Sequence, residues 1–146
     1  MIDQRNVSAF LAGRRIAVVG ASDAKQSFGR AVYVAMRDHG YEVVAVNPNA
    51  TEVAGDPCVP NLSAVDGDVD GVVLMTNATI GLDVVREAIA LGIPRVWLFK
   101  GIGAPGSVSD EAVRLCEDAG VDVIAGACPL MFLEPVGAGH RAHRFF

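Results

Sequence analysis

Apolar runs and amphipathic segments alternate along the chain. Five runs rich in Val, Ile and Leu show no polar alternation, which is typical of parallel strands covered by helices on both faces. Between them lie segments with apolar residues three or four positions apart, as in Phe28, Val32, Ala35 and Met36, which predicts amphipathic helices. This alternation indicates an α/β domain.

The predicted elements follow from this pattern. The strands cover Arg15–Gly20, Glu42–Val46, Asp70–Met75, Arg95–Phe99 and Asp122–Ala125, and the helices cover Phe28–His39, Ile80–Leu91 and Asp110–Ala119. A short extra strand is expected near Pro57–Val59 and a short leading helix at Val7–Leu11; the rest of Asn47–Pro60 is polar and predicts a loop. Each predicted helix ends at a glycine with a strand close behind, as in doubly wound folds.

We therefore expect a Rossmann-like three-layer α/β sandwich with a five- or six-stranded parallel sheet. The length of 146 residues suits one domain, which we place at residues 1–136. A tail of residues 137–146 follows, with Gly, His and Arg in no clear period.

Charge and composition narrow the function. A net charge of −5 argues against sequence-independent binding of nucleic acid. The longest apolar runs are too short to span a bilayer, and the first residues lack the apolar stretch of a signal peptide, so a cytoplasmic protein is expected. Cys58, Cys116 and Cys128 are scattered without a CxxC pair, which predicts reduced thiols rather than disulfides or zinc ligands.

The loop Gly20–Gly29 is the first candidate site, because ligands of this fold bind beyond the carboxyl ends of the strands. Gly20 and Ala21 allow a tight turn, and the helix that begins near Phe28 offers free amides to a phosphate. Ser22 adds a hydroxyl donor and Lys25 adds a positive charge. The alternative is an ordinary turn that binds nothing.

This loop departs from two familiar nucleotide signatures. Ser22 replaces the second glycine of the NAD fingerprint, and no GxxxxGK motif is present. The second strand ends in Asn47-Pro48, which provides no carboxylate for a ribose. These residues could flank a nucleotide or only form a turn. An NAD(P) site is disfavoured but stays open.

Three further strand ends carry polar or reactive residues. Thr76-Asn77 would face the cleft or simply cap the next helix. Lys25 and Lys100, the only two lysines, both follow strand ends, which favours an anionic ligand. Cys128 could line the cleft or be a small packed residue, and the second reading is favoured.

No catalytic set is evident in the sequence. No nucleophile, base and orienting residue stand out, and Ser22 lacks the GxSxG elbow. His140 and His143 have no obvious further ligands nearby, so no metal site is predicted.

Four segments together resemble the CoA-binding domain family, small proteins similar to the CoA-binding domain of the succinyl-CoA synthetase alpha subunit. They are Val18–Ser22, Gly40–Pro48, Val96–Phe99 and the late Ala127–Pro129, and the resemblance extends over Leu11–Glu134. It implies a Rossmann-like domain that holds the ADP part of CoA across the strand ends.

The resemblance also suggests residue roles. Gly20, Ala21, Ser22 and Lys25 would hold phosphate, Asn47 and Pro48 would flank the nucleotide, and Thr76 and Asn77 would form the next contact loop. The chain departs from its relatives at Lys100, where many carry Gln, and in the Gly- and Pro-rich loop Gly101–Ser107.

The sequence leaves three functions open. The favoured one is a stand-alone protein that binds CoA or acyl-CoA through the strand-end residues and has no chemistry of its own. The candidate site is completed by Phe28, Gly29, Lys100 and Cys128. The alternatives are an NAD(P)-dependent oxidoreductase and a subunit of a CoA ligase whose catalytic half comes from a partner protein.

Overall fold

The computed structural model describes residues 3–24, 26–100 and 106–133. Lys25 and the predicted tail lie outside the described residues. The principal elements are α1 (Gln4–Leu11), β1 (Arg15–Val19), α2 (Phe28–Asp38), β2 (Glu42–Val46), β3 (Glu52–Val53), β4 (Asp56–Val59), β5 (Gly71–Leu74), α3 (Ala78–Ala90), β6 (Arg95–Phe99), α4 (Asp110–Asp118) and β7 (Asp122–Ala127). Two short 3-10 helices, η1 (Leu62–Ala64) and η2 (Pro129–Met131), follow β4 and β7. No described helix is long and apolar enough to cross a membrane.

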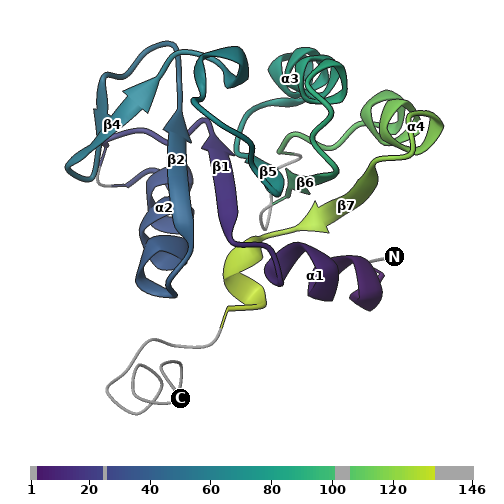
Figure 1. Cartoon of the computed structure of the whole chain (residues 1–146), viewed down its shortest axis with the longest axis horizontal. Helices are drawn as coiled ribbons and strands as arrows, with labels where there is room; N and C mark the ends of the chain where they lie inside the picture. Colours follow the sequence, from purple (N-terminus) through teal and green to yellow (C-terminus); the bar gives the residue numbers. More distant parts are fainter. Residues whose placement is uncertain (1–2, 25, 101–105, 134–146) are drawn as a thin grey trace.

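The sheet confirms the predicted Rossmann-like fold (Figure 1). Its strand order is β3-β4-β2-β1-β5-β6-β7, and the six strands from β4 to β7 pair in parallel. The chain builds outward from β1 to β2 and then crosses to β5 on the other side of β1. Strand order therefore reverses between β1 and β5, which is where ligands of this fold bind.

The segment Asn47–Pro60 is more ordered than the predicted loop. The extra strand expected near Pro57–Val59 is present as β4, but β3 was not predicted, and it pairs antiparallel with β4. The two strands form a hairpin whose turn consists of Ala54 and Gly55, both with positive φ. β3 therefore lies in the connection between the parallel strands β2 and β4, where a doubly wound fold usually has a helix.

Helices cover both faces of the sheet, as the uninterrupted apolar strands predict. In β1, Ile16 and Val18 pack toward α1 and α2, whereas Ala17 and Val19 pack toward α3 and α4. Figure 1 shows the same two layers, with α3 and α4 above the sheet and α1 and α2 below it. Burial of both faces fixes the register of each strand, because a one-residue slip would exchange the two sets.

Trp97 of β6 joins three parts of the α1 side. Its side chain is fully buried, its Nε1 donates a hydrogen bond to Ala127 O at 3.0 Å, and its ring contacts Phe10 at 5.3 Å and Phe132 at 5.6 Å between centroids. Because Phe132 directly follows η2, Trp97 helps to fix the segment after β7 against the sheet.

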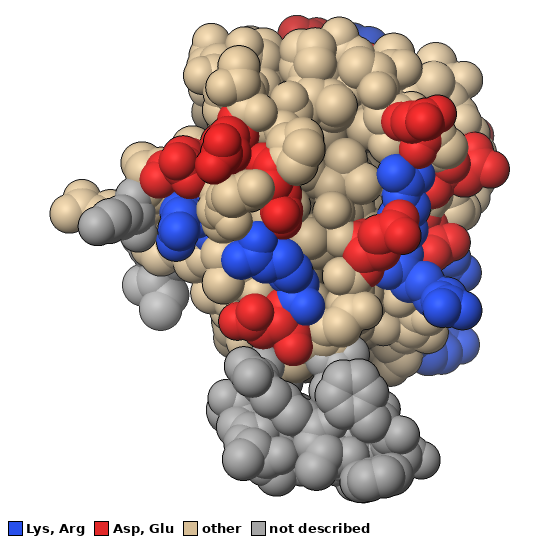
Figure 2. Space-filling view, turned by 60° about the vertical axis from the view of Figure 1, so that its left-hand side comes forward, with Lys and Arg blue, Asp and Glu red and all other residues tan. Residues whose placement is uncertain are grey.

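Most of the described arginines lie in ion pairs with Asp or Glu. On the face seen in Figure 2, Lys and Arg lie beside Asp and Glu. Arg37 pairs with Asp56 at 2.8 Å and Arg95 with Asp122 at 3.6 Å. Such exposed pairs contribute little to stability individually, but they neutralise arginines that would otherwise add positive charge to the surface.

Candidate functional site

Gly20 brings the end of β1 against the end of β5. Its φ is 93°, its amide donates to Val46 O at 2.8 Å, and a Cβ at this position would lie 2.6 Å from Met75 O. Gly29, in the first turn of α2, is equally confined, because its Cβ would lie 2.6 Å from Gly20 O. Glycine at both positions lets the first turn of α2, the β1–α2 loop and the end of β5 meet without side chains between them.

Several amides of the β1–α2 loop have no acceptor among the described residues. They belong to Ala21, Ser22, Asp23, Phe28 and Gly29. The neighbouring amides are paired, since Arg30 donates to the Ser27 hydroxyl at 3.2 Å and Ala24 to the Ser22 hydroxyl at 3.3 Å. Free amides at the start of a helix, together with the positive end of its dipole, form a site suited to an anion such as phosphate.

Asn47 connects the ends of β1 and β2. Its Nδ2 donates to Ala21 O at 2.9 Å, and its Oδ1 accepts from the amide of Asn49 at 2.9 Å. Pro48 lies in the turn that follows. The carboxamide therefore shapes the wall of the β1–α2 loop through bonds within the protein, as the turn alternative predicts.

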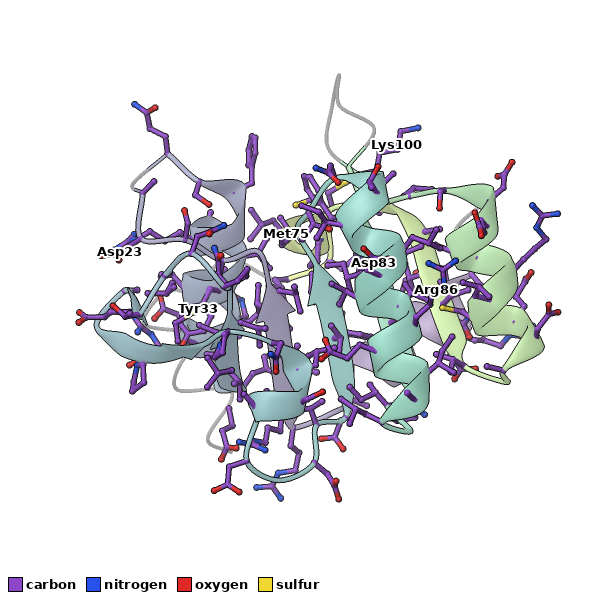
Figure 3. All side chains as sticks on the ribbon, turned by 90° about the horizontal axis from the view of Figure 1, so that it is seen from above. Asp23, Tyr33, Met75, Asp83, Arg86 and Lys100 are labelled. Carbon is purple, nitrogen blue, oxygen red and sulfur yellow. The ribbon has the colours of Figure 1, made fainter. Side chains whose placement is uncertain are left out.

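Thr76 and Asn77 lie at the end of β5, directly after Met75. Asn77 caps α3, because its Oδ1 accepts from the amide of Ile80 at 2.9 Å, and the Thr76 hydroxyl donates to Asn77 O at 3.0 Å. Capping is thus the observed role of Asn77, and the Thr76 hydroxyl bonds to the backbone beside it. They still border the switch point; in Figure 3, Met75 lies between Asp23 of the β1–α2 loop and Lys100 at the end of β6.

Phe28, Lys100 and Cys128 come together at one pocket, although they are far apart in sequence. All three line it, with Lys100 exposed and Cys128 half-buried. Burial raises the pKa of the Cys128 thiol, and a hydrogen bond from the Leu130 backbone offsets part of this effect. The thiol is therefore neutral near pH 7. Cys128 lines a pocket, which was the less favoured of its two sequence interpretations.

Sequence reasoning missed two contributors to this edge. Ser107 is fully buried, and its hydroxyl donates to Leu74 O at 2.9 Å, so it ties the segment before α4 to the end of β5. Asp23 Oδ1 accepts from the amide of Ala54 at 2.9 Å and so joins the β1–α2 loop to the β3–β4 hairpin. Both are polar residues in turn-rich stretches, where sequence alone does not identify the partner.

Metal-ligating groups and cysteines were the other candidate chemistry in the sequence. Within them, no group of three His, Cys, Asp or Glu is placed to hold a metal ion. All three cysteines are free, and Cys116 is fully buried in the core between α4 and the sheet.

Comparison with known proteins agrees with the observed fold. An uncharacterized Bacillus subtilis protein, YneT, is 33% identical over 115 residues, which cover 79% of this chain and 82% of YneT. A hypothetical protein from Pyrococcus horikoshii OT3 has a similar structure, with a TM-score of 0.80 and 26% identity over 90% of this chain and 89% of that one.

A ligase is also among the relatives. Acetate–CoA ligase [ADP-forming] I of Archaeoglobus fulgidus is 27% identical over 118 residues, which cover 77% of this chain but only 17% of the ligase. The resemblance to CoA-binding proteins is confirmed by a match to the family described as CoA binding domain over residues 14–134. The chain belongs to the CoA-binding domain family.

Proposed function

We propose that the chain binds CoA or an acyl-CoA at the switch point and performs no chemistry of its own. The observation that carries this proposal is the set of amides in the β1–α2 loop and the first turn of α2 that have no acceptor within residues 3–24, 26–100 and 106–133. They would bind the diphosphate of the ligand, with Gly20 and Gly29 keeping side chains out of the way. Membership of the CoA-binding domain family supports CoA as the bearer of that diphosphate.

The remaining candidate residues would act around this diphosphate. Ser22 and Lys25 would add a hydroxyl donor and a charge, and Lys100 would add a second charge at the end of β6. Asn47 and Pro48 would flank the nucleotide, with Asn47 held by the two hydrogen bonds described above. An NAD-type ribose contact is not favoured, because Asn47 replaces the acidic residue that such sites use.

Thermal unfolding with CoA, NAD, NADP and ATP side by side tests the proposal. A ligand that binds only the folded chain raises Tm by mass action, so we expect CoA to raise it and NAD to leave it unchanged. The double variant Ser22→Ala/Lys25→Ala should weaken the CoA response, whereas Ser63→Ala, which removes an exposed hydroxyl bound to Glu87, should keep it. A response to NAD without one to CoA would refute the proposal.

A second candidate is the CoA-binding part of an ADP-forming ligase that acts with a partner protein. It is favoured by the match to the Archaeoglobus ligase and by the structural similarity to a Ca. Korarchaeum cryptofilum acetyl-coenzyme A synthetase, with a TM-score of 0.67 and 27% identity over 77% of this chain. The purified chain should form no ATP from acetyl-CoA, ADP and phosphate. ATP formation by the chain alone would contradict a function limited to binding.

A further inference from the structure

An apolar pocket lies beside the start of α2 at the carboxyl edge of the sheet. Its volume is about 360 Å³, close to the lower end of the range for small-molecule sites. Its walls come from α2, the ends of β6 and β7, and η2; the lining residues are Phe28, Phe99, Lys100, Gly126, Cys128, Leu130 and Met131. Lys100 carries the only charged side chain among these lining residues.

Exposed apolar side chains concentrate at this pocket. Five large apolar residues are exposed in the described part of the chain, and three of them line it, including Phe28 at 67% and Met131 at 75% exposure. The Phe28 and Phe99 rings lie 6.2 Å apart between centroids and form one continuous wall. Grouped apolar surface of this kind marks a binding site, because covering it releases water.

The pocket adjoins the proposed diphosphate site through Phe28. This residue is the first of α2, so its amide is one of those available to an anion while its ring lines the pocket. A diphosphate held at this helix start has its two arms on opposite sides. The proposed nucleotide side lies at the end of β2, whereas the pocket lies on the other side of β1, at the ends of β6 and β7. The pocket therefore suits the pantetheine arm of CoA, which is long enough to bring its terminal thiol or acyl thioester to the apolar walls.

We propose that this pocket receives the thioester end of the ligand and makes an acyl-CoA with a short apolar acyl group a better ligand than free CoA. The inference rests on the proposed function and specifies its ligand class. The apolar walls favour a hydrocarbon chain, because each methylene removed from water adds to affinity. The proposed function assigns Lys100 to the diphosphate, so a carboxylate in the acyl chain would lose its hydration among the apolar walls without a cation to pair with.

Calorimetric titration of the full chain with CoA, acetyl-CoA, butanoyl-CoA and succinyl-CoA tests this ligand class. We expect butanoyl-CoA to bind about tenfold more tightly than free CoA, with acetyl-CoA between them. Succinyl-CoA should bind more weakly than butanoyl-CoA. If all four bind equally, or if succinyl-CoA binds best, the inference is wrong while the proposed function stands. If none binds, the proposed function itself fails.

A substitution at the pocket tests whether the preference for butanoyl-CoA over CoA arises there. Met131→Ser should bring the ratio of butanoyl-CoA to CoA affinity close to one, and it should leave the fold intact because Met131 is 75% exposed. Leu91→Ser is the matched control, because Leu91 is also exposed but lies at the far end of α3, and it should keep the ratio. The chain could instead be a dimer that Met131→Ser dissociates, with equal affinities for CoA and its thioesters. That result would show that the pocket serves self-association, and the inference would be wrong.

Discussion

The side chain of Asn47 determines which hydrogen bonds form at the end of β2. NAD-binding domains of this fold carry an acidic residue there, whose oxygens accept bonds from the ribose. Here the carboxamide donates to Ala21 O, which a carboxylate cannot do, and accepts from the amide of Asn49. The amide group of Asn47 therefore makes a hydrogen bond within the protein that an acidic residue at this position would lose.

Asn47→Asp should therefore lower stability without creating an NAD site. The carboxylate would face Ala21 O, and the loss should be about 1–3 kcal/mol in the free energy of unfolding, measured by urea denaturation. Asn49→Asp is the control, since Asn49 is exposed and its side chain has no hydrogen-bond partner among the described residues. Equal stability of both variants, or a rise in Tm with NAD in Asn47→Asp, would contradict this structural role of Asn47.

At the residue scale, the sequence predicted positions better than roles. The loop Gly20–Gly29 could be located between β1 and α2, because glycine after a buried strand and before a helix is typical of this turn in the fold, and its phosphate binding stays a prediction. The bonds of Asn47 and Asn77 could not, since an Asn beyond a strand suits both a ligand and a turn. Leu130 and Met131 were missed because apolar residues are expected to be buried, and only the fold shows that they line a pocket.

The β3–β4 hairpin is the element most closely linked to α2. Asp56 Oδ2 accepts hydrogen bonds from the Tyr33 hydroxyl at 2.7 Å and from Arg37 at 2.8 Å, and Arg37 also donates to Ala54 O at 2.9 Å. These bonds hold the pKa of Asp56 below its usual value, whereas burial and the bond to Asp56 raise the pKa of Tyr33. Together with Asp23, this cluster fixes the hairpin beside the β1–α2 loop.

The hairpin should therefore lose stability in acid. Because the pKa of Asp56 is lower in the folded chain than in the unfolded one, the unfolded chain takes up more protons as the pH falls. The contribution of Asp56 is complete above the usual carboxyl range and is lost as the pH falls through the lowered value. Urea denaturation from about pH 7 to about pH 3 should show a shallower acid decline in Asp56→Asn than in the wild type.

The decline should not vanish in Asp56→Asn. Asp70 accepts hydrogen bonds from the amides of Arg14 and Arg15, and these lower its pKa in the same direction. Glu52→Gln is a suitable control, because Glu52 lies on the same hairpin, is exposed and has no ion pair with a described residue. An unchanged acid slope in Asp56→Asn would show that the cluster does not couple the hairpin to pH.

The length and local conformation of each helix or strand decided whether the sequence could predict it. The long amphipathic helices and buried strands were found within one to two residues of their ends, because their periodicity is strong. The two-residue β3 has no periodicity to detect. Its turn also has Ala54, with a φ of 51°, where hairpin turns usually have Asn, Asp or Gly.

The whole molecule has two apolar layers that share one sheet. Val85 of α3 is fully buried in the layer with α4, and Trp97 of β6 is fully buried in the layer with α1. Val96 and Leu98, on either side of Trp97 in β6, face the α3 and α4 side. The sheet backbone therefore lies between the side chains of Val85 and Trp97. Side chains separated in this way should contribute independently, although the shared sheet makes the layers unfold together.

Val85→Ala and Trp97→Phe should accordingly lower stability by amounts that add. The first removes buried carbon atoms and should cost about 2 kcal/mol, and the second removes the hydrogen bond to Ala127 O and should cost roughly 1–3 kcal/mol. Urea denaturation followed by far-ultraviolet circular dichroism should give a double-variant loss within about 0.5 kcal/mol of the sum, in one transition. A departure of more than about 1 kcal/mol would mean that repacking on one face reaches the other through the sheet. The carboxyl edge of the sheet, where we propose that the ligand binds, would then respond to changes in either layer, because both layers end at it.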